Sequence, residues 1–199
     1  MEQLQSLKNH LLIAMPQLED SWFGGTVTYL CEHNEDGAMG IVLNRHMPVT
    51  FDEICEQLDI PRLPGVTPDI LAGGPVSQEN GFILHRQQGN WSSTLNVTEQ
   101  SHLTTSKDIL QAIAAGDGPK DYHLALGYAG WDADQLDEEI RTNSWLTVEA
   151  SEDILFDTPP EEIYAKALAA LLAGAFEAMD RACWLIDAAG RVGGMTPAA

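Results

Sequence analysis

Polar side chains suited to ligand binding occur where the strand-like segments of this sequence end. An arginine at such a place offers a fixed charge in a planar fork that matches a carboxylate or phosphate, and a histidine exchanges a proton near neutral pH. If the fold brings these positions together, they form a polar pocket for a small anionic ligand. If each side chain caps its own turn, they never meet. The candidate ligand-binding residues are His33, Asn34, Asn44, Arg45, His85, Tyr128, Trp131 and Gln135.

No residue pattern identifies a catalytic group, a set of metal ligands or a cofactor site. The chain has no G-x-S-x-G motif, so Ser77, Ser106 and Cys31 stand in no nucleophile signature. His33 and His85 lack the H-x-H and H-E-x-x-H spacings of metal sites, which favours hydrogen-bonded structural histidines. We therefore expect no metal and no cofactor, and whether the protein is an enzyme stays open.

Two glycine-rich segments and one acidic segment are weaker candidates. Residues 73–76 and 127–130 lack the Lys and Ser/Thr of a phosphate loop, which favours tight turns over an anion site built from backbone amides. Asp137, Glu138 and Glu139 could supply paired carboxylates. Acids in succession on a predicted helix are, however, more typical of an exposed face.

The charge balance restricts the classes of partner. Thirty acidic residues face ten basic ones in a chain of 199, a formal net charge of −20 at pH 7. Residues 132–162 hold eleven of the acids and one basic residue, Arg141. This stretch is typical of a solvated surface, or else it docks a basic protein partner or a weakly held divalent cation. Direct nucleic-acid binding and anionic membranes are not expected, because both need clustered Lys and Arg.

The cysteines and the apolar runs indicate a cytoplasmic protein without disulfides. Cys31, Cys55 and Cys183 form no C-x-x-C pair, and their number is odd. Cys31 and Cys55 lie in apolar segments, which predicts buried, unreactive thiols. The run at residues 11–15 is too short for a signal peptide, and no stretch approaches the roughly 20 apolar residues of a spanning helix.

Apolar periodicity and turn signals predict a mixture of hairpins and helices without a regular βαβ repeat, which is typical of an α+β protein. Asp36-Gly37 between two β-rich runs predicts a hairpin, and Thr50 with Glu53 predicts a helix that begins with a capping box. A second capping box is predicted at residues 158–161. We predict strands at residues 10–15, 26–33, 38–44, 70–72, 81–85, 94–97, 122–128, 145–148 and 154–156, and helices after Thr50, at 105–115, at 135–141 and from 158 onward.

Four sequence blocks carry a resemblance to a known family. They are YLCEHNEDGAMG at 29–40, GGPV at 73–76, GFILH at 81–85, and GYAGW at 127–131 followed by Gln135-Leu136. Their order and spacing resemble the AlgH/YqgE family of bacterial proteins over residues 7–172. The chain departs from the family pattern at His46, where a proline is usual after Asn-Arg, and at Asp134, where a glycine is usual.

The resemblance implies an α+β fold in which a small closed β-barrel and a bifurcated mixed sheet are surrounded by helices. Residues 1–173 are then a single AlgH/YqgE-like domain, and residues 174–199 are a C-terminal helical extension with a frayed tail. Leucines and alanines between Leu168 and Ala182 recur at helical spacing, which favours a core or packing face over a cofactor site.

The resemblance implies no settled activity, because the family is uncharacterised and its name reflects a proposed role in regulating alginate production. Our leading interpretation is a cytoplasmic binding or regulatory protein that acts through a small-molecule pocket or a protein partner. A small-molecule hydrolase that uses the polar His/Asn/Arg pocket is one alternative. A transcriptional regulator is another, although the acidic charge disfavours direct DNA binding.

The charge leads to a first prediction. At a net charge of −20 without a basic stripe, we expect no tight, salt-sensitive binding to duplex DNA. A gel-shift titration over a range of salt concentrations checks this. Tight binding at moderate salt that weakens steeply as salt rises would contradict it.

Overall fold

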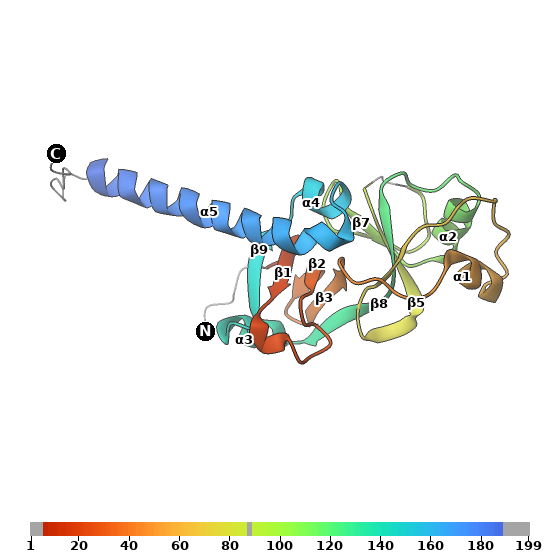
Figure 1. Ribbon diagram of the computed structural model, residues 1–199, viewed down its shortest axis with the longest axis horizontal. Coiled ribbons are helices and arrows are strands. Elements are labelled where there is room, and N and C mark those ends of the chain that lie inside the picture. The colour runs from red at the N-terminus through yellow and green to blue at the C-terminus, as the bar shows by residue number, and fades with distance from the viewer. Residues whose placement is uncertain (1–5, 87–88, 189–199) are drawn as a thin grey trace.

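The computed structural model describes residues 6–86 and 89–188, with side chains up to residue 179 (Figure 1). The strands are β1 His10–Ala14, β2 Val27–Asn34, β3 Gly37–Val42, β4 Ile70–Ala72, β5 Val76–His85, β6 Thr94–Asn96, β7 His102–Thr104, β8 Tyr122–Asp132 and β9 Trp145–Glu149. The helices are α1 Phe51–Gln57, α2 Lys107–Ala114, α3 Gln135–Arg141, α4 Glu152–Phe156 and α5 Pro160–Ala188, with a 3-10 turn at Pro16–Leu18.

The longest strand, β8, holds two sheets together. Its first half pairs with β5 on one side and with β4, in parallel, on the other. Its last four residues pair with β3 instead. Gly127 lies between the halves with a positive φ of 74°. A side chain there would collide with the carbonyl oxygen of Gly74, so both the conformation and the close approach require glycine.

The nine strands form an open, curled sheet rather than the closed barrel implied by the resemblance. Along the main path the order is β6-β7-β5-β8-β3-β2-β1-β9, and β4 branches from β8. The predicted bifurcation is therefore present. Within the described residues, β6 and β9 each pair on one side only, so the sheet ends there. A closed barrel would require β6 and β9 to pair with each other, and they do not (Figure 1).

Two local predictions are confirmed in detail. β2 and β3 form the hairpin around Asp36-Gly37. The Thr50 hydroxyl accepts from the backbone N–H of Glu53, and the Glu53 carboxylate accepts from the backbone N–H of Thr50. Both features rest on contacts between residues at most three apart, which the sequence specifies directly.

Two other local predictions are wrong. Residues 154–156, predicted as a strand, lie in helix α4, because the Ser151 side chain accepts from the backbone N–H of Ile154 and begins a helix. The second capping box does not form. The Thr158 hydroxyl donates to the backbone carbonyl of Asp153, and α5 begins at Pro160. In both places a contact with a preceding turn decides the local conformation.

Three apolar clusters fill the body, one on each side of the fork and one between. The central cluster includes Tyr29, Ile41 and Leu84. A second packs α1 and α2 against the first half of β8, and a third packs α3 near the end of β8. No helix in the part of the chain that the structure describes is long and apolar enough to cross a membrane.

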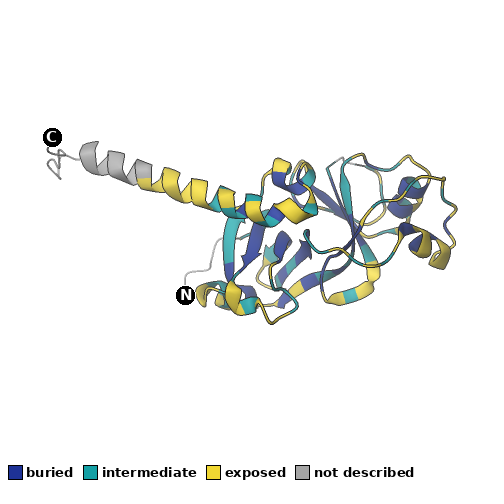
Figure 2. Ribbon diagram, in the orientation of Figure 1, coloured by how far each residue is buried: buried dark blue, intermediate teal, exposed yellow. Residues whose placement is uncertain are grey.

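Helix α5 lies against the body only along its first part. Ile163 and Ala167 are fully buried there. From Leu172 onward the described side chains are exposed, and the helix extends away from the body (Figures 1 and 2). The predicted packing face is therefore realised at Leu171, which packs on the core, but not at Leu172 or Met179. Ala182 lies outside the residues with described side chains.

Arg86 fastens α4 and the start of α5 to the end of β5. Its guanidinium lies 2.8 Å from Asp157, 3.2 Å from Glu152 and 3.4 Å from Asp121. It also lies over the ring of Phe156. Glu152 and Asp157 stand at the two ends of α4, and Asp121 directly precedes β8, so one side chain joins elements distant in sequence.

Glu139 performs the same function for α3. One of its oxygens accepts from the indole N–H groups of Trp131, at 2.9 Å, and Trp145, at 2.7 Å. The other accepts from the side-chain amide of Gln135 at 2.9 Å. Glu139 is therefore a structural acceptor that joins α3 to β8 and β9, not the exposed helix acid that its neighbours suggested.

Replacing this acceptor tests its importance. In Glu139→Gln the hydrogen bonds to the indoles lose their charge assistance, and the new amide meets the amide of Gln135. We expect the free energy of unfolding to fall by about 1–3 kcal/mol in urea titrations. Glu138→Gln is the matched control, because its side chain is 67% exposed and pairs only with Arg141 among described residues. It should change stability by less than about 0.5 kcal/mol. Equal effects of the two substitutions would contradict this assignment.

The burial of Cys31 and Cys55 leads to a prediction about thiol reactivity. Cys31 and Cys55 are 0% and 3% exposed, as predicted, and burial raises the pKa of both thiols. Since the thiolate is the reactive form, a Cys183→Ser chain should label slowly with a thiol reagent at neutral pH and rapidly after denaturation. Fast labelling of that folded variant would show that one of the two thiols is accessible.

Candidate functional site

A groove of about 800 Å³ lies at the fork of the sheet. One wall is the β2–β3 hairpin, another is the last part of β8, and the third is β5, which pairs with β8 at Val76 and then shifts register before Gly81. The groove therefore lies where the pairing of β8 with β5, at residues 122–128, passes to the pairing with β3, at residues 129–132. Its volume falls in the usual range for ligand sites.

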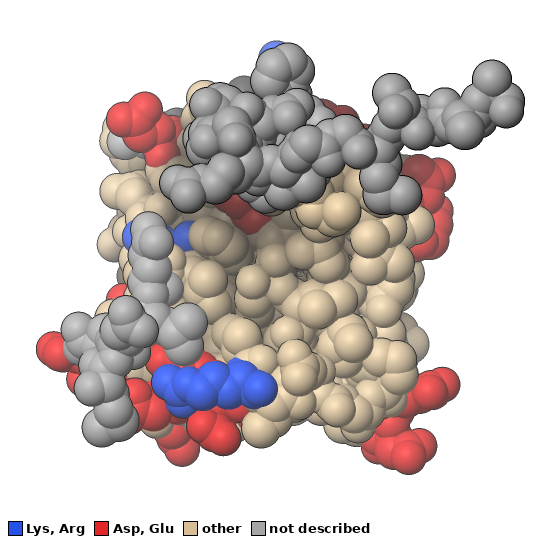
Figure 3. All heavy atoms as spheres, turned by 90° about the vertical axis from the view of Figure 1, so that its left-hand side faces the viewer, with Lys and Arg blue, Asp and Glu red and all other residues tan. Residues whose placement is uncertain are grey.

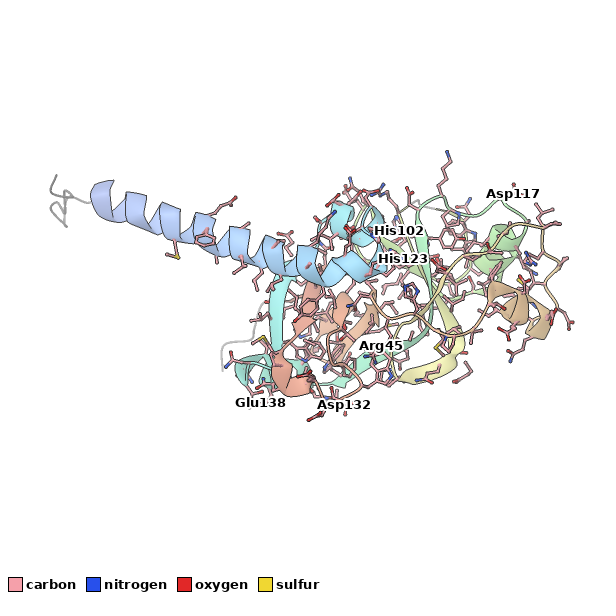
Figure 4. All side chains as sticks on the ribbon, viewed as in Figure 1. Arg45, His102, Asp117, His123, Asp132 and Glu138 are labelled. Atoms are coloured by element: carbon pink, nitrogen blue, oxygen red, sulfur yellow. The ribbon has the colours of Figure 1, made fainter. Side chains whose placement is uncertain are left out.

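Carboxylates form the rim of the groove, and local hydrogen bonds hold their backbone. Glu32, Asp36 and Asp132 all line it. The backbone N–H of Asp36 donates to the side chain of Asn34 at 2.9 Å, and the Asn34 amide donates to Glu32 at 3.1 Å. The backbone N–H of Asp132 donates to Gln135 at 2.9 Å. In Figure 4, Asp132 lies at the lower margin of the body.

Apolar and aromatic side chains form the floor. Phe82 on β5 and Tyr128 on β8 pack with their ring centroids 5.3 Å apart. Met39 and Val76 also line the groove. Gly130 leaves room beside the Tyr128 ring, since a Cβ on it would lie 3.1 Å from that ring. The site thus combines a partly buried aromatic surface with an acidic rim.

No described residue neutralises the acidic rim. The residues that line the groove include no Lys, Arg or His. Across the described chain, no salt bridge involves Glu32, Asp36 or Asp132. No described group of three or more His, Cys, Asp or Glu side chains has the arrangement of a metal site. The field in the groove therefore favours a cation that carries its own apolar part.

Four of the eight sequence candidates are associated with this groove. Asn34, Tyr128 and Trp131 line it. Gln135 does not, but it holds the backbone of Asp132. Trp131 is buried, stacks on Phe23 and donates to Glu139, so only part of its surface faces the groove.

His33 lies at the same end of the sheet but faces another direction. Its Nδ1 accepts from the backbone N–H of Leu7 at 2.9 Å, which leaves the proton on Nε2. Nε2 lies 3.6 Å from the carboxylate of Asp137. The ring therefore fastens the N-terminal segment and α3 to β2.

Asn44 and Arg45 fasten the loop before β2. The Asn44 side chain accepts from the backbone N–H of Val27 and donates to the carbonyl of Gly25. The Arg45 guanidinium donates to the carbonyl of Trp22 and lies 4.7 Å from the centre of its ring. These contacts occupy the planar fork that the sequence suggested for an anionic ligand.

His85 lies at the other end of the fold. It is fully buried, with Nε2 2.9 Å from the Thr104 hydroxyl and its ring against Trp91. His85 of β5 pairs with Tyr122 of β8. His33 of β2 pairs with Ala38 of β3, which in turn pairs with Trp131 of β8. Nine residues of β8 separate these positions, a length of about 30 Å for an extended strand. The structure therefore does not bring His33, Arg45 and His85 into one pocket.

The sequence did not identify the acids of the groove or, apart from Tyr128, the residues of its floor. Glu32 and Asp36 belong to the hairpin that was predicted, but turn chemistry alone explained them. Phe82 and Met39 looked like ordinary strand residues. Nothing in the sequence indicated that the register between β5 and β8 would shift between Val76 and Gly81, beside the groove.

Comparison with known proteins places this arrangement in a family. The sequence profile described as AlgH-like matches residues 11–174. A UPF0301 protein of Saccharophagus degradans is 50% identical over 163 residues, which cover 81% of this chain and 80% of that protein. A UPF0301 protein of Vibrio vulnificus is 45% identical over 183 residues, covering 89% and 98%.

Two solved structures resemble this one. The solution structure of AlgH from Pseudomonas aeruginosa superimposes with a TM-score of 0.76 at 42% identity, over 98% of this chain and 99% of that one. A crystal structure of a Corynebacterium diphtheriae protein has a TM-score of 0.57 at 21% identity, over 77% and 81%, and shares the fold. The profile, the relatives and the first structure agree, and this chain belongs to the AlgH-like family.

Proposed function

We propose that this protein is a cytoplasmic binding protein that holds a positively charged, partly apolar group in the groove at the fork of its sheet. The ligand class is an amine or guanidinium attached to an apolar segment, either as a free small molecule or as a basic stretch of a protein partner. The observation that carries the proposal is the unneutralised acidic rim over an aromatic floor.

Charge and packing act at different positions of such a ligand. Glu32, Asp36 and Asp132 attract the cation from above the groove. The cation loses little hydration at an exposed rim, so its attraction gives selectivity more than affinity. Phe82 and Tyr128 offer apolar surface for the attached carbon chain, and that burial contributes most of the affinity.

This proposal replaces the small anionic ligand expected from the sequence. That expectation depended on Arg45, whose guanidinium is engaged with Trp22 and with the carbonyl of Gly24. An anion in the groove would face three carboxylates and no lysine or arginine among the lining residues. The electrostatic cost therefore favours a cation.

Binding without chemistry is favoured over the hydrolase alternative. Thr105 is the one hydroxyl besides Tyr128 among the groove-lining residues, and no histidine lines the groove to act as its base. A regulatory role is compatible with the proposal if the basic segment belongs to a regulatory protein. Direct reading of DNA is opposed by the same acidic rim.

Calorimetry with matched probes tests the proposal. The probes are hexylamine, spermidine, a short peptide of alternating Lys and Leu, and citrate as the anion. We expect at least one cationic probe to bind, and the Asp36→Asn/Asp132→Asn double variant to bind it at least about tenfold more weakly. Binding of the free amines indicates a small ligand, and binding of the peptide alone indicates a protein segment.

The control removes two charges outside the groove. Glu56→Gln with Glu138→Gln lowers the net charge equally, but neither residue lines the groove. It should leave the affinity within about twofold, because exposed charges beyond a Debye length are screened. Failure of every cation to bind, tighter binding of citrate, or an equal loss in the control would overturn the proposal.

A further inference from the structure

The projecting part of α5 carries large apolar side chains that no described residue covers. Leu172, Phe176 and Met179 are 52%, 69% and 64% exposed. They lie beyond the point where Ile163 and Ala167 pack against the body. Figure 2 shows this part of the helix exposed along its described length. Three large apolar groups on one solvated helix are typical of an interaction surface.

These three residues lie on the face of α5 that points away from the body. A helix turns by about 100° per residue, so Leu172 lies about half a turn around the axis from Ile163. Phe176 and Met179 lie within about 40° of Leu172 on the same count. The body contacts the opposite face, so the described part of this chain does not cover the apolar face.

The spacing on this face is that of a coiled coil. Leu172, Phe176 and Met179 are separated by four and then three residues, and the sequence continues the same spacing to Cys183 and Ile186 within α5. Alternation of four and three residues is the pattern by which two helices keep one seam in contact. We call these five positions the α5 seam. It spans about 21 Å of helix.

The charges favour a second copy of this chain as the occupant. The molecule has a net charge of −20, yet residues 172–186 hold three charged residues, Glu177, Asp180 and Arg181, with a net charge of −1. Figure 3 shows the end from which α5 projects: most described atoms belong to uncharged residues, and the acidic groups lie around the margin. Two copies can approach here without bringing acids into contact. A basic partner finds little negative charge on the seam, and an anionic lipid surface would be repelled by the rest of the molecule.

The residues beside the seam favour a parallel over an antiparallel arrangement of the two helices. In the heptad register of the seam, Ala175 and Ala182 fall on one flank, and Asp180 and Asp187 fall on the other. Parallel helices place each flank against the opposite flank of the partner, so aspartates meet alanines. Antiparallel helices would place Asp180 against its own copy. We propose that two copies of this protein associate through a parallel coiled coil formed by their α5 seams, independently of the groove.

Sedimentation equilibrium on matched single substitutions tests the association. The seam covers two heptads, so we expect dissociation of a dimer of twice 21.7 kDa in the range of about 1–100 µM. Phe176→Glu should weaken it at least about tenfold. Ala178→Glu adds the same charge two residues away, about 160° around the helix, and should leave it within about twofold.

A native chain that stays monomeric up to about 500 µM would overturn the proposal. So would a dimer that Ala178→Glu weakens as strongly as Phe176→Glu, because the seam would then not be the contact. Binding of the monomer to neutral phospholipid vesicles, lost in Phe176→Glu, would assign the seam to a lipid surface instead.

The orientation has a separate readout in Cys183. A parallel pair brings Cys183 of the two copies to the same level of the seam, while Cys31 and Cys55 are buried. Mild oxidation should give a disulfide-linked dimer on a non-reducing gel, and Cys183→Ser should abolish it. A dimer in solution that never cross-links would overturn the parallel arrangement.

Discussion

The division of β8 at Gly127 is the constraint on which the rest of the structure depends. One strand pairs in both halves of the sheet. Its backbone takes a positive φ at Gly127, where the carbonyl of Gly74 leaves no space for a side chain. Before that point β8 pairs with β4 and β5, and after it β5 keeps one pair, Val76 with Tyr128, while residues 129–132 pair with β3. A Cβ at Gly127 would force Gly74 away and loosen both pairings. The branch separates two apolar clusters, opens the sheet and leaves a groove between β3 and β5.

Polar side chains near the fork form two groups: some stabilise the fold, and others have no basic partner among described residues. Glu139 and Arg86 each bind several partners from segments distant in sequence, so these side chains are engaged within the structure. Glu32, Asp36 and Asp132 have no basic partner among described residues. In a chain with three times as many acids as bases, this is the default for a surface carboxylate. At the groove, the unpaired carboxylates lie beside an aromatic floor, and this combination suits a cation with an apolar part.

The family relationship and the two proposals concern different parts of the chain. The AlgH-like match ends at residue 174, inside α5, and includes the fork and the groove. The apolar seam lies almost wholly beyond it, on the continuous helix that runs to Ala188. The groove is thus a property that relatives with the same fork can share. The seam is argued from the residues of this chain alone.

The sequence by itself determined the features that depend on near neighbours. The β2–β3 hairpin, the Thr50 capping box, the buried Cys31 and Cys55 and the α+β class follow from turn chemistry, capping and apolar spacing. Tertiary structure decided whatever depended on contacts between distant segments. His33, Arg45 and His85 share strand ends in the sequence, yet each is held by a different distant partner. The groove lies where the β8 pairing passes from β5 to β3, beside a register shift between Val76 and Gly81, and only the pairing of segments distant in sequence decides where this happens.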